Sequence, residues 1–210
     1  MKRVCALLLA AGESRRMGAA NKLTLDVDGE PLVRRTARTL LASGIGEVVA
    51  VLGHQADVIG PLLVDLPVKQ VTNPDYADGQ MTSVHRGMAA LDTPADGVMV
   101  ALADQALLTV ADVNTLIDAF QGIEEGRVLV PVHQGRRGNP IILSFRHREA
   151  ILAGAPNLGC RRLLERHPEL VTPVEMASDH VVFDLDTPDD YAELQRRRRA
   201  APAAGRTMEG

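Results

Sequence analysis

Short apolar runs alternate along the chain with stretches whose apolar residues recur at helical spacing. Residues 4–9 and 97–103 are continuously apolar, which is typical of strands covered on both faces of a parallel sheet. Shorter runs predict further strands at 47–52, 68–71, 127–132 and 181–185. The helical pattern covers 31–43, 56–63, 81–91, 109–120, 144–153 and 159–167, and a last helix starts at Pro188 and ends in the arginine run 196–199.

This alternation of strands and helices indicates an α/β fold with a mostly parallel sheet. In such sheets, ligands bind in the loops beyond the carboxyl ends of the strands. The loops after Leu9, Leu52, Val71 and Ala103 are therefore the places where we expect a binding site.

Composition narrows the class of protein. The 210 residues suit one large domain, and the hydrophobic share of 46% is ordinary for a globular protein. An aromatic share of 2% and a net charge of -4 argue against a nucleic-acid partner. Cys5 and Cys160 have no disulfide or metal-ligand spacing, and Cys5 lies in an apolar run typical of a core.

No apolar stretch reaches the roughly 18 residues that a membrane span needs. The apolar start of the chain continues into a charged loop, so we interpret it as a strand and not as a signal peptide. We expect a cytoplasmic protein without a membrane partner.

The loop after the first strand is suited to a polyphosphate. Ala10, Ala11 and Gly12 are small enough for the backbone to approach a ligand closely, and backbone N–H groups bind phosphate oxygens. Arg16 and Lys22 add positive charge. The glycine spacing matches neither a Walker A loop nor a dinucleotide fingerprint. On composition alone, a solvated surface loop is an equally good interpretation.

Two carboxylates follow strands at distant points of the sequence. Asp104 ends the apolar run 97–103, and Asp186 stands in the segment 184–191. Carboxylates at strand ends suit Mg²⁺, which prefers hard oxygen ligands and substrate phosphates. A solvated turn or helix cap is the alternative for Asp104. Helix capping accounts for residues 187–190, but it does not explain Asp184 and Asp186.

One long motif carries a family resemblance. Leu9-Ala10-Ala11-Gly12-x-Ser14-x-Arg16-Met17-Gly18, followed by Lys22, closely resembles the signature of MobA-like NTP transferases. The triplet Ala10-Ala11-Gly12 resembles the molybdenum cofactor cytidylyltransferase branch, because the guanylyltransferase branch usually has Ala-Gly-Gly. The resemblance extends from Val4 to about Leu194. It implies a three-layer, Rossmann-like nucleotidyltransferase fold with helices on both faces of the sheet and a single domain over 1–195. The small and polar residues at the end of the chain predict a disordered tail, which we place at 196–210.

The resemblance also implies roles for particular residues. Lys22, Arg16 and Asp104 would be catalytic, and Asp104 and Asp186 would hold Mg²⁺, for which Mn²⁺ could substitute. The implied nucleotide-binding residues are Leu9, Ala10, Ala11, Gly12, Arg16, Lys22, Gly79, Ser83 and Asp104. For the hydroxyls of Thr82 and Ser83, capping of the following helix is the alternative.

Two segments depart from the family pattern or have a plain structural alternative. Around Asp104 the family motif is Gly-Asp-Gln-Pro, and here Ala103 and Ala106 replace the glycine and the proline that would stiffen this loop. The segment 135–140 resembles the part of the family that faces the acceptor, with Arg137, Asn139 and Pro140 as acceptor-binding residues and Arg136 beside them. A tight hairpin turn is its alternative. The arginines at 196–199 indicate a solvated helix end.

The function implied is CMP transfer from CTP to the molybdopterin cofactor, with release of pyrophosphate. Alternatives are another NTP or acceptor, such as GTP with molybdopterin or a sugar phosphate, a binding protein that transfers nothing, and a redox enzyme that uses the cleft for a dinucleotide. The expected partners are small-molecule substrates, and transient contact with molybdoenzyme chaperones is also compatible with this function. We expect a monomer or weak oligomer.

Overall fold

A computed structural model of the chain describes residues 1–17, 21–154 and 167–200. Its centre is a mixed sheet with strand order β10-β7-β9-β6-β1-β4-β5, and the short β8 pairs with β7. The strands are β1 (Val4–Ala10), β4 (Val48–Leu52), β5 (Lys69–Thr72), β6 (Gly97–Leu102), β7 (Val128–His133), β8 (Arg136–Arg137), β9 (Ile141–Ser144) and β10 (Val171–Glu175). A separate two-stranded ribbon joins β2 (Asp26–Val27) to β3 (Glu30–Pro31).

The apolar runs form the middle of this sheet, as the pattern predicts. β1 lies between β4 and β6 and is parallel to both, with Leu8 opposite Ala50 on one side and Ala101 on the other. All seven residues of β1 are buried. Both faces of the central strands must therefore be covered, which explains why their sequences are apolar at every position.

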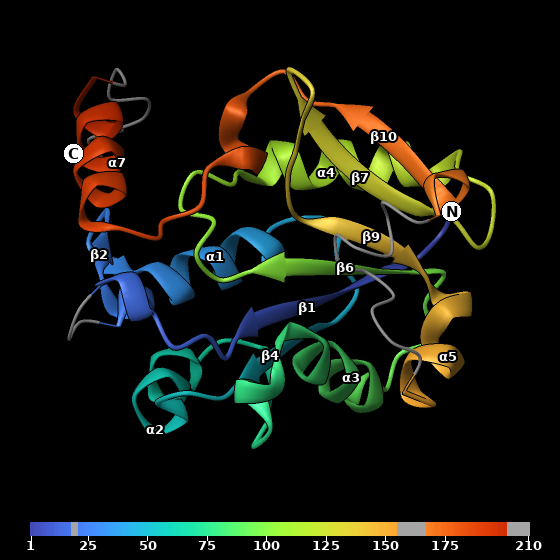
Figure 1. The fold of residues 1–210 in the computed structure, drawn as a ribbon, viewed down its shortest axis with the longest axis horizontal. Coiled ribbons are helices and arrows are strands. Elements are labelled where there is room, and N and C mark those ends of the chain that lie inside the picture. The colour runs from blue at the N-terminus through green and yellow to red at the C-terminus, as the bar shows by residue number, and fades with distance from the viewer. Residues whose placement is uncertain (18–20, 155–166, 201–210) are drawn as a thin grey trace, which may run out of the picture.

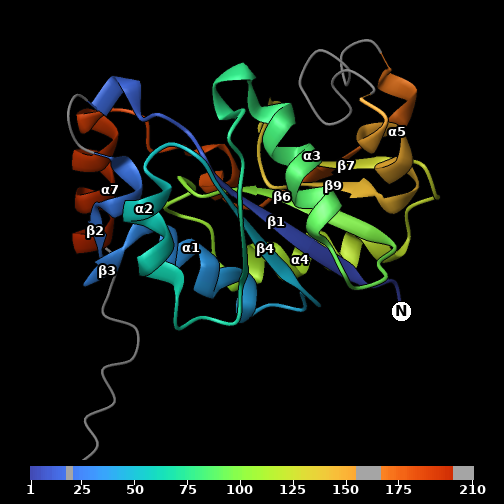
Figure 2. The ribbon, with the colours of Figure 1, turned by 90° about the horizontal axis from the view of Figure 1, so that it is seen from below.

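Helices cover the two faces. The helices are α1 (Leu32–Leu41), α2 (Ala56–Ile59), α3 (Gln80–Ala90), α4 (Val110–Gln121), α5 (Arg148–Leu152) and α7 (Pro188–Ala200). On β1, Leu8 packs in a core cluster with α1 and α4, whereas Leu7 packs in the opposite cluster with α3 and α5. α1 and α4 accordingly lie on one side of the sheet, and α3 and α5 on the other (Figures 1 and 2). The three-layer, Rossmann-like arrangement is confirmed.

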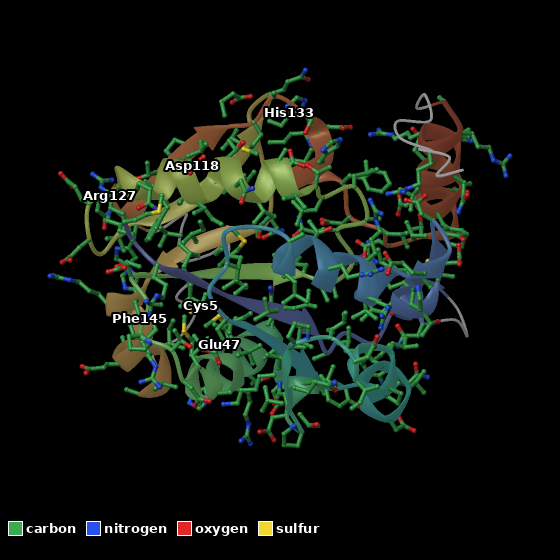
Figure 3. The ribbon with its side chains drawn as sticks, turned by 180° about the vertical axis from the view of Figure 1, so that it is seen from behind. Cys5, Glu47, Asp118, Arg127, His133 and Phe145 are labelled. Atoms are coloured by element: carbon green, nitrogen blue, oxygen red, sulfur yellow. The ribbon has the colours of Figure 1, made fainter. Side chains whose placement is uncertain are left out.

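Local signals account for several boundaries. Thr109 caps α4 in a capping box with Asp112. Thr187 and Asp190 form the same arrangement at the start of α7, where Asp190 accepts from the Thr187 N–H and hydroxyl, both at 2.7 Å. Cys5 is fully buried beside Glu47 (Figure 3), and burial, then the Glu47 charge, raises the pKa of its thiol. Cys5 is thus a core residue.

The predicted strand at 181–185 is wrong. A 3₁₀ turn over Asp179–Val182 and an extended link replace it. Val181 and Leu185 are buried, but they belong to two different core clusters, so their apolar character reflects packing and not strand pairing. The sheet gains β9 and β10 instead, at positions that the apolar pattern did not identify as strands.

Three other expectations need correction or fall outside the described part. The helix expected at 144–153 begins with a 3₁₀ turn at Phe145, because Ser144 still belongs to β9. Helix α7 runs from Pro188 to Ala200, which confirms the helix predicted through the arginine run. The tail expected from residue 196 is therefore helical over 196–200, and 201–210 lie outside the described residues. Of the helix expected at 159–167, only His167 is described, and it is not helical. Within the described ranges, no helix is long and apolar enough to cross a bilayer.

Candidate functional site: a cleft at the carboxyl edge of the sheet

A cleft of about 500 Å³ opens where β1 and β6 end side by side. Its walls come from the loops after β1, β5 and β6 and from the link that leads into α7. The lining residues are Leu9, Ala11, Gly12, Glu13, Ser14, Arg16, Lys22, Leu23, Tyr76, Ala77, Gly79, Gln80, Ser83, Leu102, Asp104 and Asp186. These segments are distant in sequence, so the fold brings most of the predicted nucleotide-binding residues into one place.

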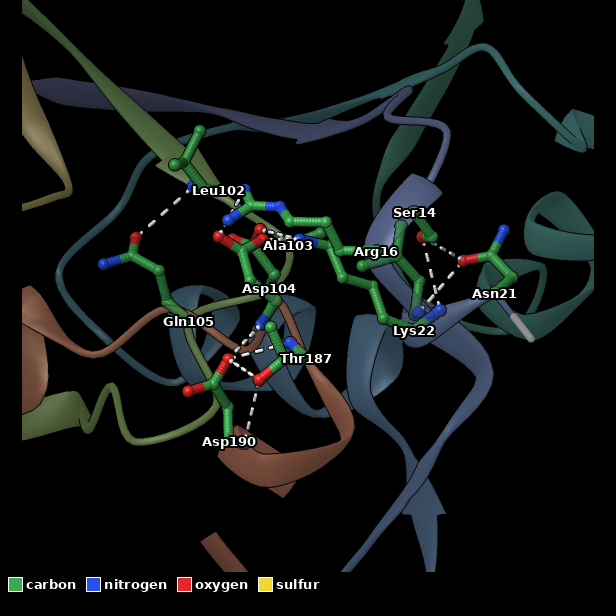
Figure 4. Close-up of polar contacts among 12 residues, drawn as sticks. Ser14, Arg16, Asn21, Lys22, Leu102, Ala103, Asp104, Gln105, Thr187 and Asp190 are labelled. Carbon is green, nitrogen blue, oxygen red and sulfur yellow. Dashed lines mark hydrogen bonds and ion pairs between the residues drawn. The ribbon is translucent and has the colours of Figure 1, made fainter. Parts of the chain in front are cut away.

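The loop after β1 is folded so that Lys22 points into the cleft (Figure 4). Ser14 adopts a positive φ of 53°, and its hydroxyl accepts from the Lys22 N–H at 3.3 Å. Asn21 accepts from the Leu23 N–H at 3.0 Å, and its amide group donates to the Gln55 side chain at 2.8 Å. Gly18 and its two successors lie outside the described residues. The start of the following turn is therefore tied both to its own loop and to the segment after β4.

Lys22 joins the two predicted metal-binding carboxylates. Its ammonium lies 2.5 Å from Asp104 Oδ2 and 2.7 Å from Asp186 Oδ1, and Arg16 reaches Asp186 Oδ2 at 2.8 Å. Burial alone would lower the pKa of Lys22, but the charges and hydrogen bonds of the two aspartates outweigh it and raise that pKa. Lys22 therefore keeps its positive charge between the two carboxylates in the wall of the cleft.

Asp184 is a third carboxylate beside this cluster. Burial, followed by repulsion from Asp104 and Asp186, raises the pKa of Asp184 to about 6. Its Oδ1 is buried without a hydrogen-bond partner among the described residues. The sequence left Asp184 unexplained by helix capping, but it gave no signal that this side chain would face the other two aspartates.

The donor set fits a hard divalent cation in part. Asp104 Oδ1 is buried and has no hydrogen-bond partner in the described part of the chain, so it caps no helix there. Within the described residues, no group of three or more histidine, cysteine, aspartate or glutamate side chains is spaced to hold a metal. Mg²⁺ is commonly held by one or two carboxylates together with substrate phosphates and water, so Asp104 and Asp186 fit a metal that arrives with a nucleotide.

Hydrogen bonds hold Ala103, Asp104 and Gln105 in the loop that carries Asp104. Thr36 donates its hydroxyl to the Ala103 carbonyl at 3.3 Å, and Leu185 donates its N–H to the Asp104 carbonyl at 3.1 Å. The side chain of Gln105 accepts from Leu102 N at 3.3 Å and donates to the Asn139 carbonyl at 2.6 Å. These bonds keep the loop in place although alanines replace the family's glycine and proline.

Two arginines hold the next residue of that loop. The Ala106 carbonyl accepts from Arg35 at 3.4 Å and from Arg198 at 3.3 Å, and both arginines pair with Asp28. Burial lowers the pKa of Arg198, and Arg197 binds Asp179 at 2.7 Å. The expectation of a solvated arginine run is therefore wrong for Arg197 and Arg198, which connect α7 to the body of the protein.

The far wall of the cleft is formed by Tyr76 and the start of α3. Gly79, with φ of 115°, precedes α3, and no side chain caps this helix, so the capping alternative for Thr82 and Ser83 is wrong. A Cβ on Gly53 would lie 2.7 Å from the Ala11 Cβ and 2.8 Å from that of Tyr76, so three loops meet there without room for a side chain. No sequence motif pointed to Tyr76 or Gly53.

Several predicted residues do not line the cleft. Ala10 is 1% exposed and packs in the core beneath it. Arg137, Asn139 and Pro140 also lie outside its lining, after a hairpin in which Gln134 and Gly135 both have positive φ. The hairpin-turn alternative for this segment is confirmed. Its link to the cleft is indirect, through the bond from Gln105 to the Asn139 carbonyl.

Comparison with known proteins gives the family. The model of the MobA-like NTP transferase domain matches residues 6–171. Nicotine blue oxidoreductase of Paenarthrobacter nicotinovorans is 31% identical over 91% of this chain and 96% of its own. Molybdenum cofactor cytidylyltransferase of Escherichia coli is 27% identical over 94% of this chain and 98% of its own.

Solved structures agree on the fold. A nucleotidyl transferase from Methanothermobacter superposes with a TM-score of 0.80 at 21% identity, over 95% of this chain and 99% of that one. Rv0371c of Mycobacterium tuberculosis, solved in complex with manganese, superposes with a TM-score of 0.71 at 20% identity, over 92% of this chain and 98% of that one. The residues that match the family model, 6–171, run from β1 through most of the sheet and include the loops that carry Lys22 and Asp104. The chain therefore belongs to the MobA-like NTP transferase domain family of nucleotidyltransferases.

Proposed function

We propose that this protein transfers CMP from CTP to the terminal phosphate of the molybdopterin cofactor and releases pyrophosphate. The observation that carries the proposal is the position of Lys22 between Asp104 and Asp186 in the wall of the cleft. When a triphosphate binds with a divalent cation, Lys22 would bind phosphate oxygens, and Asp104 and Asp186 would be free to hold the metal. The arrangement is already charge-matched for that exchange.

In the proposed reaction, an oxygen of the acceptor phosphate forms a bond to the α-phosphorus of CTP. The bond from that phosphorus to the bridging oxygen of the β-phosphate breaks, and its electron pair leaves with pyrophosphate. Lys22 and Arg16 neutralise the charge that develops on the leaving group. The nucleophile belongs to the substrate, so the protein acts by positioning and charge neutralisation.

The metal would be Mg²⁺ or Mn²⁺, held by Asp104 and Asp186. When bound, it supplies charge neutralisation for the phosphates and fixes their orientation. The Mycobacterium tuberculosis relative in fold that was solved with manganese supports this choice of ion. Gln105 and the arginines on the Ala106 carbonyl keep Asp104 in place for that role.

The preference for CTP rests on Ala10-Ala11-Gly12 and on the cytidylyltransferase among the relatives. Ala11 and Gly12 line the cleft, and Gly79 and Ser83 would face the base and ribose from the opposite wall. The acceptor would approach along the hairpin that precedes Asn139, where Arg136 and Arg137 are exposed. The proposal includes a cytoplasmic location, small-molecule substrates, transient contact with molybdoenzyme chaperones and a monomer or weak oligomer.

A second candidate follows from the oxidoreductase among the relatives, which is 31% identical over nearly the whole chain. In that case the cleft would hold a dinucleotide, and a redox reaction would replace nucleotidyl transfer. The cluster of Lys22, Asp104 and Asp186 favours the transferase. A triphosphate binds with a metal ion that these two carboxylates could hold, whereas binding of a dinucleotide does not require a metal ion.

The test is pyrophosphate release measured with CTP, GTP, ATP and UTP, each with and without molybdopterin cofactor, beside an assay for NADH and NADPH oxidation. We expect release with CTP and only when the cofactor is present. Release that depends on GTP or on another acceptor would contradict the finer proposal. Dinucleotide oxidation without pyrophosphate release would favour the oxidoreductase.

Variants link that activity to the cleft. We expect Lys22→Ala and Asp104→Ala each to lower kcat/KM by a factor of about 10² to 10³, since each removes a charge that acts on the phosphates. Lys69→Ala is the matched control, because Lys69 binds Asp92 at 2.6 Å on an exposed strand. Circular dichroism checks that all three variants fold. Full activity in either cleft variant would overturn the assignment.

A further inference from the structure

Asn73 is a fully buried amide behind the cleft wall, between β5 and α3. Its backbone N–H donates to the Leu52 carbonyl at 2.7 Å, and its side-chain Oδ1 accepts from the Asp75 N–H at 3.1 Å. A backbone N–H is only a donor, so this contact fixes which end of the amide is oxygen. The Nδ2 group must then face the other way, toward the start of α3.

Two hydroxyls receive the Nδ2 protons. Thr82 Oγ1 lies at 2.8 Å and Ser83 Oγ at 3.0 Å. The hydroxyl protons of Thr82 and Ser83 differ in whether they have an acceptor. Thr82 has carbonyl acceptors on Asp75 at 2.9 Å and on Gly79 at 2.8 Å, whereas within the described residues no acceptor lies in hydrogen-bonding position for the Ser83 proton.

The Ser83 hydroxyl is therefore polarised in one direction. Because Asn73 Nδ2 is a donor, Ser83 Oγ must accept from it and must point its own proton elsewhere. Ser83 lines the cleft, although only 3% of the residue is exposed. A buried hydroxyl with an unused proton is costly unless a ligand or water accepts it.

We propose that Asn73 is a positioning residue that makes Ser83 a hydrogen-bond donor to the bound nucleoside. The inference rests on the proposed nucleotide site and deepens it. Ser83 selects for an acceptor atom at this point of the ligand, such as a carbonyl oxygen of a pyrimidine, and disfavours an amino or N–H group there. Asn73 does not touch the nucleotide and acts only through Ser83.

A near-isosteric substitution separates this polarity from packing. In Asn73→Asp, one carboxylate oxygen still accepts from the Asp75 N–H. The other oxygen replaces the Nδ2 donor, so the Ser83 hydroxyl turns its proton toward the carboxylate and presents a lone pair to the ligand. The side chain keeps its size, while the hydrogen bond offered to the nucleoside reverses.

The experiment is a double-mutant cycle with Asn73→Asp, Ser83→Ala and the double variant. CTP affinity of the full-length protein is measured by calorimetry with Mg²⁺, and melting temperatures are recorded in parallel. We expect Asn73→Asp to weaken CTP binding by about tenfold in the presence of Ser83 and by less than twofold in the Ser83→Ala background. The second comparison also measures any general repulsion between the new carboxylate and the triphosphate.

Thr82→Val is the matched control, because Thr82 accepts from the same amide but its proton is already used. We expect a lower melting temperature with CTP affinity within twofold of wild type. Equal losses for Asn73→Asp in both backgrounds, no loss in either, or a loss in Thr82→Val as large as that in Asn73→Asp would overturn the inference. Absence of binding by wild type to any of the four NTPs would instead contradict the proposed function.

Discussion

At the scale of single residues, ion pairs in this protein differ in how far they are withdrawn from water. The side chains of Lys22 and Asp104 are 12% and 16% exposed, whereas those of Lys69 and Asp92 are 41% and 79% exposed. Exposed pairs contribute little to stability, but removing one member of a buried pair leaves an unpaired charge. Lys22 is thus important both for the charge balance of the cleft and for its proposed chemistry.

The pair of His180 and Asp112 leads to a prediction about pH. The hydrogen bond that His180 Nδ1 donates to Asp112 Oδ2, at 2.8 Å, raises the pKa of His180, and burial opposes this increase. Asp179 adds to this increase and Arg197 opposes it. A raised folded-state pKa contributes stability that is fully present below the unfolded value of 6.5 and is lost as pH rises through the folded value.

We therefore expect His180→Gln to lower the free energy of unfolding more at about pH 5.5 than at about pH 8.5. Burial opposes the ionised form of Asp112, but its bonds to His180 and Thr109 lower its pKa, so this carboxylate remains charged at both values. Urea denaturation at the two pH values measures the difference. His167→Gln is the control, because within the described part of the chain His167 pairs with the exposed Glu169, and we expect changes within about 0.5 kcal/mol. Equal effects of His180→Gln at both pH values would contradict the account.

The sequence was informative about individual residues where a motif carries charge. Lys22 and Asp104 could be chosen because small residues precede the first and a strand end precedes the second, whereas Asp186 was chosen from the family resemblance, since helix capping leaves Asp184 and Asp186 equally open. Asp184 and Asn73 could not be chosen in the same way. The role of Asp184 depends on Asp104, which is distant in sequence, and the role of Asn73 depends on the direction of its hydrogen bond to Ser83. Neither feature is visible in a linear pattern.

At the scale of elements, the hairpin after β7 supports the link that carries the aspartates. Gly138 donates its N–H to the Pro131 carbonyl, and Asn139 donates to the Val181 carbonyl at 2.8 Å. A Cβ on Gly138 would lie well inside contact distance of the Val181 carbonyl group. That group is backbone and cannot rotate aside, so the 3₁₀ turn before Asp184 would have to move.

We expect Gly138→Ala to lower the free energy of unfolding by about 1–3 kcal/mol, the usual cost of overpacking. Because the displaced turn leads to Asp184 and Asp186, we also expect at least a tenfold loss of kcat/KM. Chemical denaturation and the pyrophosphate assay measure the two effects. Gly122→Ala is the control, since its nearest neighbour would be the Ala119 carbonyl oxygen at 4.0 Å and its φ of -89° suits alanine. If both variants behave alike, the proposed contact is not important.

Elements were predictable where burial and periodicity agree. The strands β1, β4 and β6 are apolar on both faces, and helix α1 has its apolar residues on one side. β10 lies at the edge of the sheet, with partly exposed residues and a proline at Pro173, so its sequence does not look like that of a buried strand. The run at 181–185 looks like a strand because its apolar residues fill two separate clusters.

At the scale of the whole molecule, the sheet determines where chemistry can occur. The loops after β1 and β6 must lie together because the two strands are parallel neighbours in the sheet. The sequence indicated the parallel centre and therefore this edge. The antiparallel β9 between β6 and β7 could not be foreseen, since its position depends on long-range pairing and not on local pattern.

The most direct test of the central claim is the metal dependence of nucleotide binding. CTP is titrated calorimetrically into wild type, Asp104→Asn and Asp118→Asn, each with Mg²⁺ and with EDTA. Asp118 is exposed on α4 (Figure 3) and serves as the matched control. We predict that Mg²⁺ tightens binding at least tenfold in wild type and in the control, and less than twofold in Asp104→Asn. The same Mg²⁺ dependence in all three proteins would contradict the assignment of this cleft as a metal–nucleotide site.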